Sequence, residues 1–240
     1  MPCCSGCAMP NFFAEQFKGS IAKFPSEDSH HILHVLRLKP GEIIRVSIEG
    51  KRYQAVLEVD TGQAIARITQ ELPSSEAQIR ITLYQGWPKK DKLDLITRQA
   101  TELGVYAIVP CVFTRCIARP DQDSRRIERL NRIAREAAMQ SGRALVPDVE
   151  SPISYTELIN RLKQHGQALV PYELENGTSL REVYQGALDV ALVIGPEGGF
   201  TEEEIQGMPA LPLTLGPRIL RTETAGAAAI AMLLALANDF

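Results

Sequence analysis

The C-terminal region of this chain, residues 190–237, constrains the fold more than any other part of the sequence. An apolar, β-branched run over residues 190–194 predicts a buried strand, and a glycine-rich turn over residues 195–199 follows it directly. A second glycine-proline turn over residues 215–217 precedes a long apolar helical stretch that ends near residue 237. Strand, glycine turn and helix in this repeated order predict a parallel α/β sheet with a ligand site at the carboxyl ends of its strands.

The two turns differ from the common nucleotide-binding loops. Neither has the Walker spacing or the dinucleotide fingerprint. The helix after the first turn begins with Thr201 and the glutamates 202–204, which predicts a capping box with Thr201 as the N-cap. Carboxylates at this helix end disfavour a phosphate, so we expect a neutral or cationic ligand held by backbone groups. The alternative is that the two turns bind no ligand. Arg218 and Arg221 argue against it, because two guanidinium groups near a helix start favour binding of an anionic group beside the second turn.

Both turns resemble the signature motifs of the RsmE family. The matching sequences are GPEGGF at residues 195–200 and LGPRILRTETA at residues 215–225, and the resemblance covers nearly the whole chain from Met9 onward. RsmE proteins are bacterial enzymes that methylate N3 of a uridine in 16S ribosomal RNA with S-adenosylmethionine. They belong to the SPOUT class, whose C-terminal chain forms a trefoil knot that binds S-adenosylmethionine.

Periodicity and the resemblance together give the expected domains. Alternating segments over residues 43–49, 53–59 and 64–69 predict a small β-rich unit, and strands alternate with helices after residue 79, which predicts a parallel α/β sheet. A short helix is expected over residues 29–38. The resemblance implies a PUA-like β-barrel followed by a SPOUT domain with the trefoil knot. The expected divisions are a disordered N-terminal extension at 1–8, a PUA-like RNA-binding barrel at 9–72, a linker at 73–78 and the SPOUT methyltransferase domain at 79–240.

Composition indicates an ordinary globular protein. Hydrophobic residues make up 45% of the chain and charged residues 23%. The longest apolar run, residues 225–237, is too short to span a bilayer, and no apolar N-terminal signal is present, so we expect a cytoplasmic protein without a membrane partner. The net charge is −3, but residues 73–150 carry an excess of basic side chains, which favours RNA contacts in the middle of the chain.

Clustered cysteines and histidines raise the question of a metal site. Cys3, Cys4 and Cys7 lie together near the N-terminus, and three histidines lie within residues 30–34. Neither cluster has a complete ligand set nearby, so we expect no metal and interpret the cysteines as part of a loose extension. The histidines are interpreted as surface residues or RNA contacts.

Basic residues in two segments are candidates for binding the RNA substrate. The helix expected over residues 123–140 carries arginines on one face, whose planar donors match phosphates. Residues 89–92 form a lysine-rich loop. Ion pairs on the helix and a solvated charge run in the loop are the alternatives. The substrate candidates are Arg37, Lys89, Lys90, Lys92, Arg125, Arg129, Arg132, Arg143 and Arg218.

The glycine turns and the resemblance identify the candidates for the cofactor pocket. The resemblance adds the end of the strand predicted over residues 168–172 to the two turns. The expected S-adenosylmethionine-binding residues are Tyr172, Glu173, Ile194, Gly195, Pro196, Glu197, Gly198, Gly199, Leu215, Gly216, Ile219, Leu220, Arg221 and Ala225.

Arg221 and Glu223 are the candidate catalytic residues. Arg221 would stabilise the negative charge that develops on the uracil ring, or orient the base. Glu223 would act as the base, or alternatively only place a negative charge at a helix N-terminus.

The resemblance also implies partners. The helix expected over residues 223–237 is apolar nearly all round, which predicts that it is buried. SPOUT proteins pair through such helices, so we expect a homodimer, with 16S ribosomal RNA within the small ribosomal subunit as the macromolecular partner. Two rival functions remain: a SPOUT enzyme that methylates a ribose 2′-hydroxyl or another base, and an RNA-binding ribosome-assembly factor without catalysis.

Overall fold

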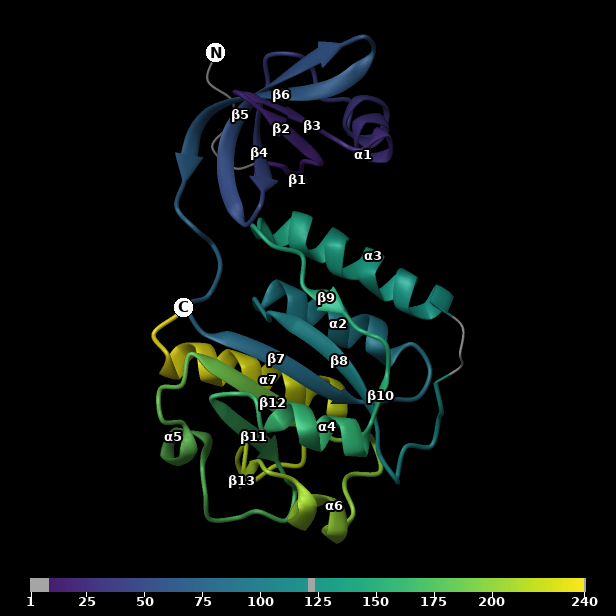
Figure 1. The fold of residues 1–240 in the computed structure, drawn as a ribbon, viewed down its shortest axis with the longest axis vertical. Helices are drawn as coiled ribbons and strands as arrows, with labels where there is room; N and C mark the ends of the chain where they lie inside the picture. The colour runs from purple at the N-terminus through teal and green to yellow at the C-terminus, as the bar shows by residue number, and fades with distance from the viewer. Residues whose placement is uncertain (1–8, 121–123, 240) are drawn as a thin grey trace. The chain divides into compact units, whose positions relative to one another are not determined.

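The computed structural model describes residues 9–120 and 124–239 (Figure 1). The chain divides into two compact units. Met1–Glu76 and Ala138–Val146 form the first unit, whereas Ala77–Ala137 and Pro147–Phe240 form the second. A segment from the middle of the chain therefore belongs to the same unit as the N-terminal residues.

The first unit is built on a six-stranded sheet with the order β1-β4-β5-β6-β3-β2. Strand β1 pairs in parallel with β4, and the other neighbours are antiparallel. Alternate side chains of the sheet enclose a core that includes Phe12, Ile44 and Leu57. The strands are β1 (Asn11–Phe13), β2 (Gln16–Lys18), β3 (Ile21–Lys23), β4 (Ile43–Ile48), β5 (Lys51–Asp60) and β6 (Gln63–Leu72).

Two tight hairpins set the register of the long strands in this sheet. Glu49 and Gly50 connect β4 to β5, and Thr61 and Gly62 connect β5 to β6. All four residues have positive φ angles between 47° and 82°. Two-residue loops with positive φ at both positions match the right-handed twist of antiparallel strands. Strands β4, β5 and β6 therefore lie where the alternating sequence pattern predicts them.

The helical segment of the first unit differs from the prediction of one helix over residues 29–38. Helix α1 (Ser26–His30) begins earlier, directly after Pro25, and continues as a π-helical turn η1 (His31–Val35). The segment also ends earlier than expected, because Arg37 has a φ of 54° that no helix accommodates.

The second unit contains a seven-stranded parallel sheet with the order β10-β8-β7-β12-β11-β13, and β9 pairs with β8. The prediction of a parallel α/β sheet is confirmed, whereas the trefoil knot stays a prediction. The strands are β7 (Arg80–Gly86), β8 (Ala107–Val112), β9 (Asp148–Val149), β10 (Ile153–Ser154), β11 (Gln167–Pro171), β12 (Asp189–Ile194) and β13 (Leu211–Leu213).

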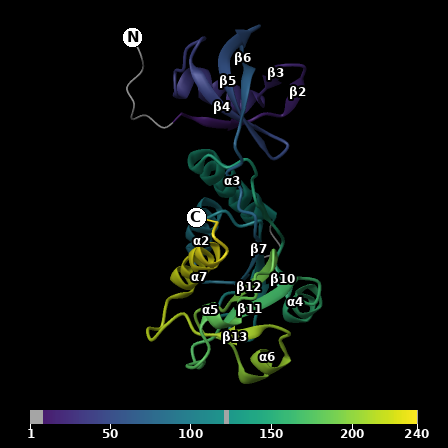
Figure 2. The ribbon, with the colours of Figure 1, turned by 90° about the vertical axis from the view of Figure 1, so that its left-hand side faces the viewer.

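Helices cover both faces of this sheet, which explains why β7 and β12 are almost entirely buried. Figure 2 shows α2 and α7 on one side of the sheet and α4 on the other. The helices are α2 (Lys92–Glu102), α3 (Ser124–Ser141), α4 (Tyr155–Leu162), α5 (Leu180–Val183), α6 (Glu202–Gly207) and α7 (Thr222–Leu236).

Helix α7 is less buried than its apolar sequence predicts. One face, which includes Ala229, Ile230 and Leu233, packs inside the second unit. Met232 is 39% exposed and Ala235 is also exposed, so within the single chain the predicted burial holds for one face of the helix and is wrong for the other. The spacing of apolar residues in the sequence cannot separate these faces, because apolar residues occupy both of them.

Candidate functional site

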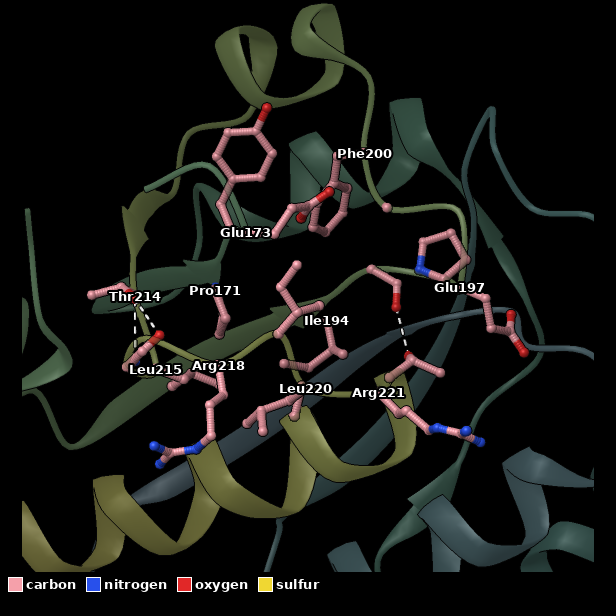
Figure 3. Close-up of a pocket in the computed structure, with 18 of the residues that line it drawn as sticks. Pro171, Glu173, Ile194, Glu197, Phe200, Thr214, Leu215, Arg218, Leu220 and Arg221 are labelled. Atoms are coloured by element: carbon pink, nitrogen blue, oxygen red, sulfur yellow. Dashed lines mark hydrogen bonds between the residues drawn. The ribbon is translucent and has the colours of Figure 1, made fainter. Parts of the chain in front are cut away.

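A pocket of about 580 Å³ lies at the carboxyl ends of β11, β12 and β13, beside the start of α7. Two segments form most of its wall (Figure 3). We call residues 195–200 the first glycine loop and residues 214–221 the second glycine loop. Clefts of this volume bind ligands of nucleoside or cofactor size. The position agrees with the general rule that open parallel sheets bind ligands at the carboxyl ends of their strands.

The first glycine loop begins where β12 ends and is held at both of its ends. The N–H of Gly199 donates to the carbonyl of Pro196 at 2.9 Å, and the φ of 67° at Gly199 suits a residue without a side chain. Phe200 is buried and packs edge-on against Phe113, with the ring centroids 5.0 Å apart. The loop therefore enters the pocket as a fixed turn.

The capping box predicted after the first glycine loop is confirmed. The Thr201 hydroxyl accepts from the N–H of Glu204 at 3.2 Å, and the Glu204 carboxylate accepts from the N–H of Thr201 at 2.9 Å. Glu204 also accepts from the N–H of Thr114 at 2.8 Å and is 5% exposed. One buried carboxylate thus fixes the start of α6 and the loop after β8.

A chain of buried hydrogen bonds joins the first glycine loop to β7 and α7. The hydroxyl of Thr222 donates to the carbonyl oxygen of Gly195 at 2.6 Å. The side-chain amide of Gln85 in turn donates to that hydroxyl at 2.8 Å. Because Gln85 and Thr222 are both buried, these bonds fix the direction of the Gly195 carbonyl at the pocket wall.

The side chain of Thr214, at the start of the second glycine loop, stabilises the fold of this loop. Thr214 Oγ1 accepts from the N–H of Gly216 at 3.1 Å and donates to the carbonyl of the same residue at 3.2 Å. Figure 3 shows Leu220 near Ile194, Leu215 next to Thr214, and the guanidinium groups of Arg218 and Arg221 well apart from each other.

Three charged side chains meet at the edge of the pocket. The Lys92 ammonium nitrogen lies 3.2 Å from Glu197 Oε1 and 3.1 Å from Glu223 Oε2. The bond to Glu223 is the largest cause that raises the pKa of Lys92. Burial raises the pKa of both glutamates, but their own backbone N–H groups and Lys92 outweigh it and hold each pKa below its ordinary value. The contribution of Arg221 acts in the same direction on Glu223. Both carboxylates are therefore ionised at neutral pH.

The structure brings all the residues expected to bind the cofactor to this one pocket. Each of the fourteen, from Tyr172 to Ala225, lines it. Arg218 also lines the pocket, although the sequence grouped it with the RNA contacts. Several other residues that line the pocket were not predicted from the sequence, although most of them lie within or next to the two glycine motifs. The missed lining residues are Pro171, Asn176, Phe200, Thr214, Pro217 and Thr222.

Lys92 is placed differently from the expectation that it contacts RNA. Its ammonium group is directed to Glu197 and Glu223 in the pocket, and the side chain is 31% exposed. Lys89 and Lys90 lie in the loop before α2, where Lys89 is half-buried and Lys90 is exposed. The loop sequence could not separate these lysines, because the difference depends on carboxylates that lie far along the chain.

The arginines of α3 divide into two groups. Arg126 lies over the ring of Trp87 at 4.5 Å and donates to the carbonyl of Lys90 at 2.7 Å. Arg129 pairs with Asp94, so the ion-pair alternative holds for this residue. Arg125 and Arg132 are exposed on the same helix.

Arg143 is a correction to the predicted RNA contacts. It is 4% exposed, and its Nη2 lies 2.6 Å from Oε2 of Glu76. Its carbonyl oxygen accepts from Asn11 and Ser47 at 3.1 and 2.9 Å. A buried guanidinium with this partner stabilises the first unit. Arg37 lies in the first unit and is exposed.

Neither a metal site nor a membrane span emerges from the part of the chain that the structure describes. Within residues 9–120 and 124–239, no three His, Cys, Asp or Glu side chains are grouped as metal ligands. In the same ranges, no helix is both long and apolar enough to cross a bilayer. Cys3, Cys4 and Cys7 lie outside the described residues, as does the whole predicted extension 1–8.

Comparison with known proteins shows to which family the chain belongs. Residues 75–234 match the model of an RNA methyltransferase domain, and residues 24–69 match that of an RNA methyltransferase PUA domain. A ribosomal RNA small subunit methyltransferase E from Bacillus subtilis is 32% identical over 237 residues, which cover 90% of this chain and 93% of the relative. The chain belongs to this methyltransferase family. A second member, from Aquifex aeolicus, is 30% identical and covers 93% of this chain and 98% of its own length.

Two solved structures are similar to this chain over nearly its whole length. The ribosomal RNA small subunit methyltransferase E from Neisseria gonorrhoeae, bound to S-adenosyl methionine, has a TM-score of 0.86 and 33% identity, and covers 95% of this chain and 98% of its own. A putative methyltransferase from Legionella pneumophila, in complex with the same cofactor, has a TM-score of 0.83 and 30% identity, with the same coverage.

Proposed function

We propose that this protein transfers the methyl group of S-adenosylmethionine to N3 of a uridine in 16S ribosomal RNA of the small ribosomal subunit. The observation that carries the proposal is the convergence of both glycine loops and the start of α7 on one pocket of about 580 Å³. Membership of the methyltransferase family supports the same activity, and two structural neighbours hold the cofactor.

The residues of the pocket fit S-adenosylmethionine. Ile194, Leu215 and Leu220 offer apolar surface for an adenine ring, and the loop backbones offer amides and carbonyls for its edges. The carboxylates of Glu173 and Glu197 lie in the same wall, and they suit a ligand with cationic groups. When bound, S-adenosylmethionine supplies an electrophilic methyl group on a sulfonium.

We assign the contact with the uracil base to Arg221. It is the exposed N-cap of α7 and lines the pocket, so its guanidinium can meet a base that has left its stack. A uracil that loses its N3 proton becomes anionic, and a fixed cation stabilises that charge. Glu223 suits the helix-terminal alternative better than the role of base, because the lowered pKa makes its carboxylate a weak proton acceptor.

We assign RNA binding to the exposed basic residues of both units. Arg125 and Arg132 of α3, with Lys89 and Lys90, are the contacts proposed for the second unit, and Arg37 is proposed for the first. Cations of this kind bind phosphates and position the RNA without reading its sequence. The proposed site of action is the cytoplasm, where the small ribosomal subunit is made.

A homodimer is the proposed assembly. Helix α7 exposes apolar side chains that include Met232, and Ile219 in the second glycine loop is 87% exposed. Exposed apolar side chains on these two segments support an interface with a partner protein. A second copy of the chain would cover it beside the pocket. The same proposal includes the trefoil knot and the domain divisions at 9–72 and 79–240.

Methyl transfer from labelled S-adenosylmethionine to small subunits that lack the modification tests the proposed activity. Mass spectrometry of the product should place the methyl group on N3 of a uridine. A methyl group on a ribose hydroxyl would overturn the assigned base chemistry. Absence of cofactor binding in calorimetry would favour an assembly factor without catalysis.

The role of Arg221 is tested separately. Arg221→Ala should abolish methyl transfer and leave cofactor affinity largely intact, because the neighbouring loop backbones still hold the cofactor. Arg98→Ala is the matched control, since Arg98 is exposed on α2 and does not line the pocket. Normal turnover of the Arg221 variant would contradict the assignment.

A further inference from the structure

Lys92 joins three segments that lie far apart in the sequence. It is the first residue of α2, whereas Glu197 lies in the first glycine loop and Glu223 in the first turn of α7, after the second glycine loop. Its ammonium nitrogen lies 3.2 Å from one carboxylate and 3.1 Å from the other. The side chains of the two glutamates are only 21% and 15% exposed. Partial burial distinguishes this group from surface ion pairs, which water screens.

The backbone before α2 adds a second contact with the same carboxylate. The N–H of Lys89 donates to Oε1 of Glu197 at 3.1 Å, so this oxygen meets both Lys89 and Lys92. The first glycine loop is thus fastened to the start of α2 by a backbone donor and by a charged side chain. Both contacts lie within the second unit.

Without the ammonium group, two ionised carboxylates would face each other at the edge of the pocket. Each has an oxygen within about 3 Å of the same nitrogen, so the two oxygens are close neighbours. Like charges at such separations repel strongly in a partly buried site. The repulsion would push the first glycine loop and the start of α7 apart, and these are the two walls that hold the pocket.

We infer that Lys92 is a positioning residue for methyl transfer, which holds Glu197 and Glu223 together so that the pocket loops and Arg221 keep their places. The inference rests on the proposed function only for its effect on turnover. Lys92 does not touch the uracil in this assignment; it acts through Glu223, which lies two residues after Arg221 in the same helix turn.

The charged groups that face the two carboxylates set the expected pH dependence. Lys92 from α2 and Arg221 from the start of α7 lower the pKa of Glu223, and Lys92 and the backbone lower that of Glu197. Loss of the ammonium group should raise both pKa values, and the two carboxylates would raise each other further. Protonation of either carboxylate removes the repulsion, so the rate of Lys92→Met should approach that of the unaltered protein as pH falls through the raised pKa values.

The test compares Lys92→Met, which keeps the aliphatic stem, with Lys92→Arg, which keeps the charge. Lys163→Met is the control, since Lys163 is exposed at the end of α4 and outside the pocket. Single-turnover methyl transfer is measured against pH at saturating cofactor and RNA. At neutral pH, Lys92→Met should slow the step by about 100-fold, as expected for reacting groups misplaced by about 1 Å, and this loss should shrink as the pH falls. Lys92→Arg should restore much of the rate.

A measurement on the protein alone separates this inference from the proposed function. Carboxyl carbons of labelled glutamates are titrated by NMR without cofactor or RNA. In Lys92→Met the pKa of Glu223 should rise, and adding Glu197→Gln to that variant should lower it again by removing the facing charge. This result can be obtained even if no methyl transfer to ribosomal RNA is found.

Two outcomes would overturn the inference. Unchanged glutamate titrations in Lys92→Met would show that the ammonium group does not hold the carboxylates. A raised KM for RNA, with a single-turnover rate that equals that of the unaltered protein at every pH, would show that Lys92 is an RNA contact. If Lys92→Met fails to fold, the double variant with Glu197→Gln and the Lys92→Arg variant still provide both readouts.

Discussion

Gly86, the last residue of β7, meets the first glycine loop so closely that a methyl group has no room. A Cβ atom built on Gly86 would lie 2.4 Å from the nitrogen and 2.7 Å from the Cδ of Pro196, and 2.8 Å from the carbonyl carbon of Gly195. Backbone and ring atoms cannot rotate away as a side chain can. Since ordinary contacts begin at 3.4 Å, Gly86→Ala must displace the loop by about 1 Å.

The size of the effect follows from this displacement. Forcing an extra methyl group into a packed interior costs about 1–3 kcal/mol of the free energy of unfolding. A misplacement of about 1 Å at a reaction site costs about 100-fold in rate. The displaced loop also carries the Gly195 carbonyl that Thr222 holds at 2.6 Å, so the buried hydrogen bond would lengthen with it. We therefore expect a fold that is weakened but retained, with a much larger loss of cofactor binding and turnover.

Three measurements check the prediction: urea unfolding, calorimetric affinity for S-adenosylmethionine, and single-turnover methyl transfer. Gly177→Ala is the matched control, because its Cβ would meet only the end of the Glu175 side chain, at 3.6 Å. This control should behave like the unaltered protein. Wild-type cofactor affinity and turnover in Gly86→Ala would refute the idea that the contact between β7 and the first glycine loop fixes the pocket.

Further substitutions and pH probe the buried contacts. Thr222→Val should cost about 1–3 kcal/mol of the free energy of unfolding, measured in urea, because its two buried partners lose their hydrogen bonds. Glu76→Gln should cost about 3–5 kcal/mol, since it removes the carboxylate charge that lies 2.6 Å from the buried Arg143 guanidinium; an unchanged unfolding curve would contradict the structural role of the pair. The lowered pKa values of Glu197 and Glu223 stabilise the fold above the pKa of an unfolded glutamate, about 4.3, and that contribution is lost as pH falls through the folded values. The melting temperature should therefore fall less steeply below this pH in Glu197→Gln than in the unaltered protein.

The features that could be predicted from the sequence are local ones. The capping box at Thr201 depends on residues three apart, and the hairpin turns depend on adjacent residues with glycine in second place. The position of the pocket was also predictable, because glycine turns that follow parallel strands must meet at one edge of the sheet. Local patterns of this kind do not change with the rest of the fold.

The features that could not be predicted depend on partners far along the chain. Arg143 is buried because Glu76, 67 residues earlier, meets its guanidinium. Lys92 is drawn into the pocket by carboxylates that lie more than 100 residues later. In the sequence, both look like ordinary basic residues of an RNA-binding protein. The exposed face of α7 could not be predicted for a related reason. The sequence of an apolar helix does not show whether its own chain or another chain covers each face.

Because Ala138–Val146 belong to the first unit, this unit cannot be completed until that segment has been synthesised. During synthesis the strands up to Leu72 leave the ribosome first, yet they lack Arg143 and the carbonyl to which Asn11 and Ser47 donate. Asn11, Ser47 and Glu76 therefore lack their contacts with Arg143 until about seventy further residues have been translated. An N-terminal fragment that ends in the linker would lack these contacts permanently. Fusing residues 138–146 to this fragment through a short spacer should restore a folded product.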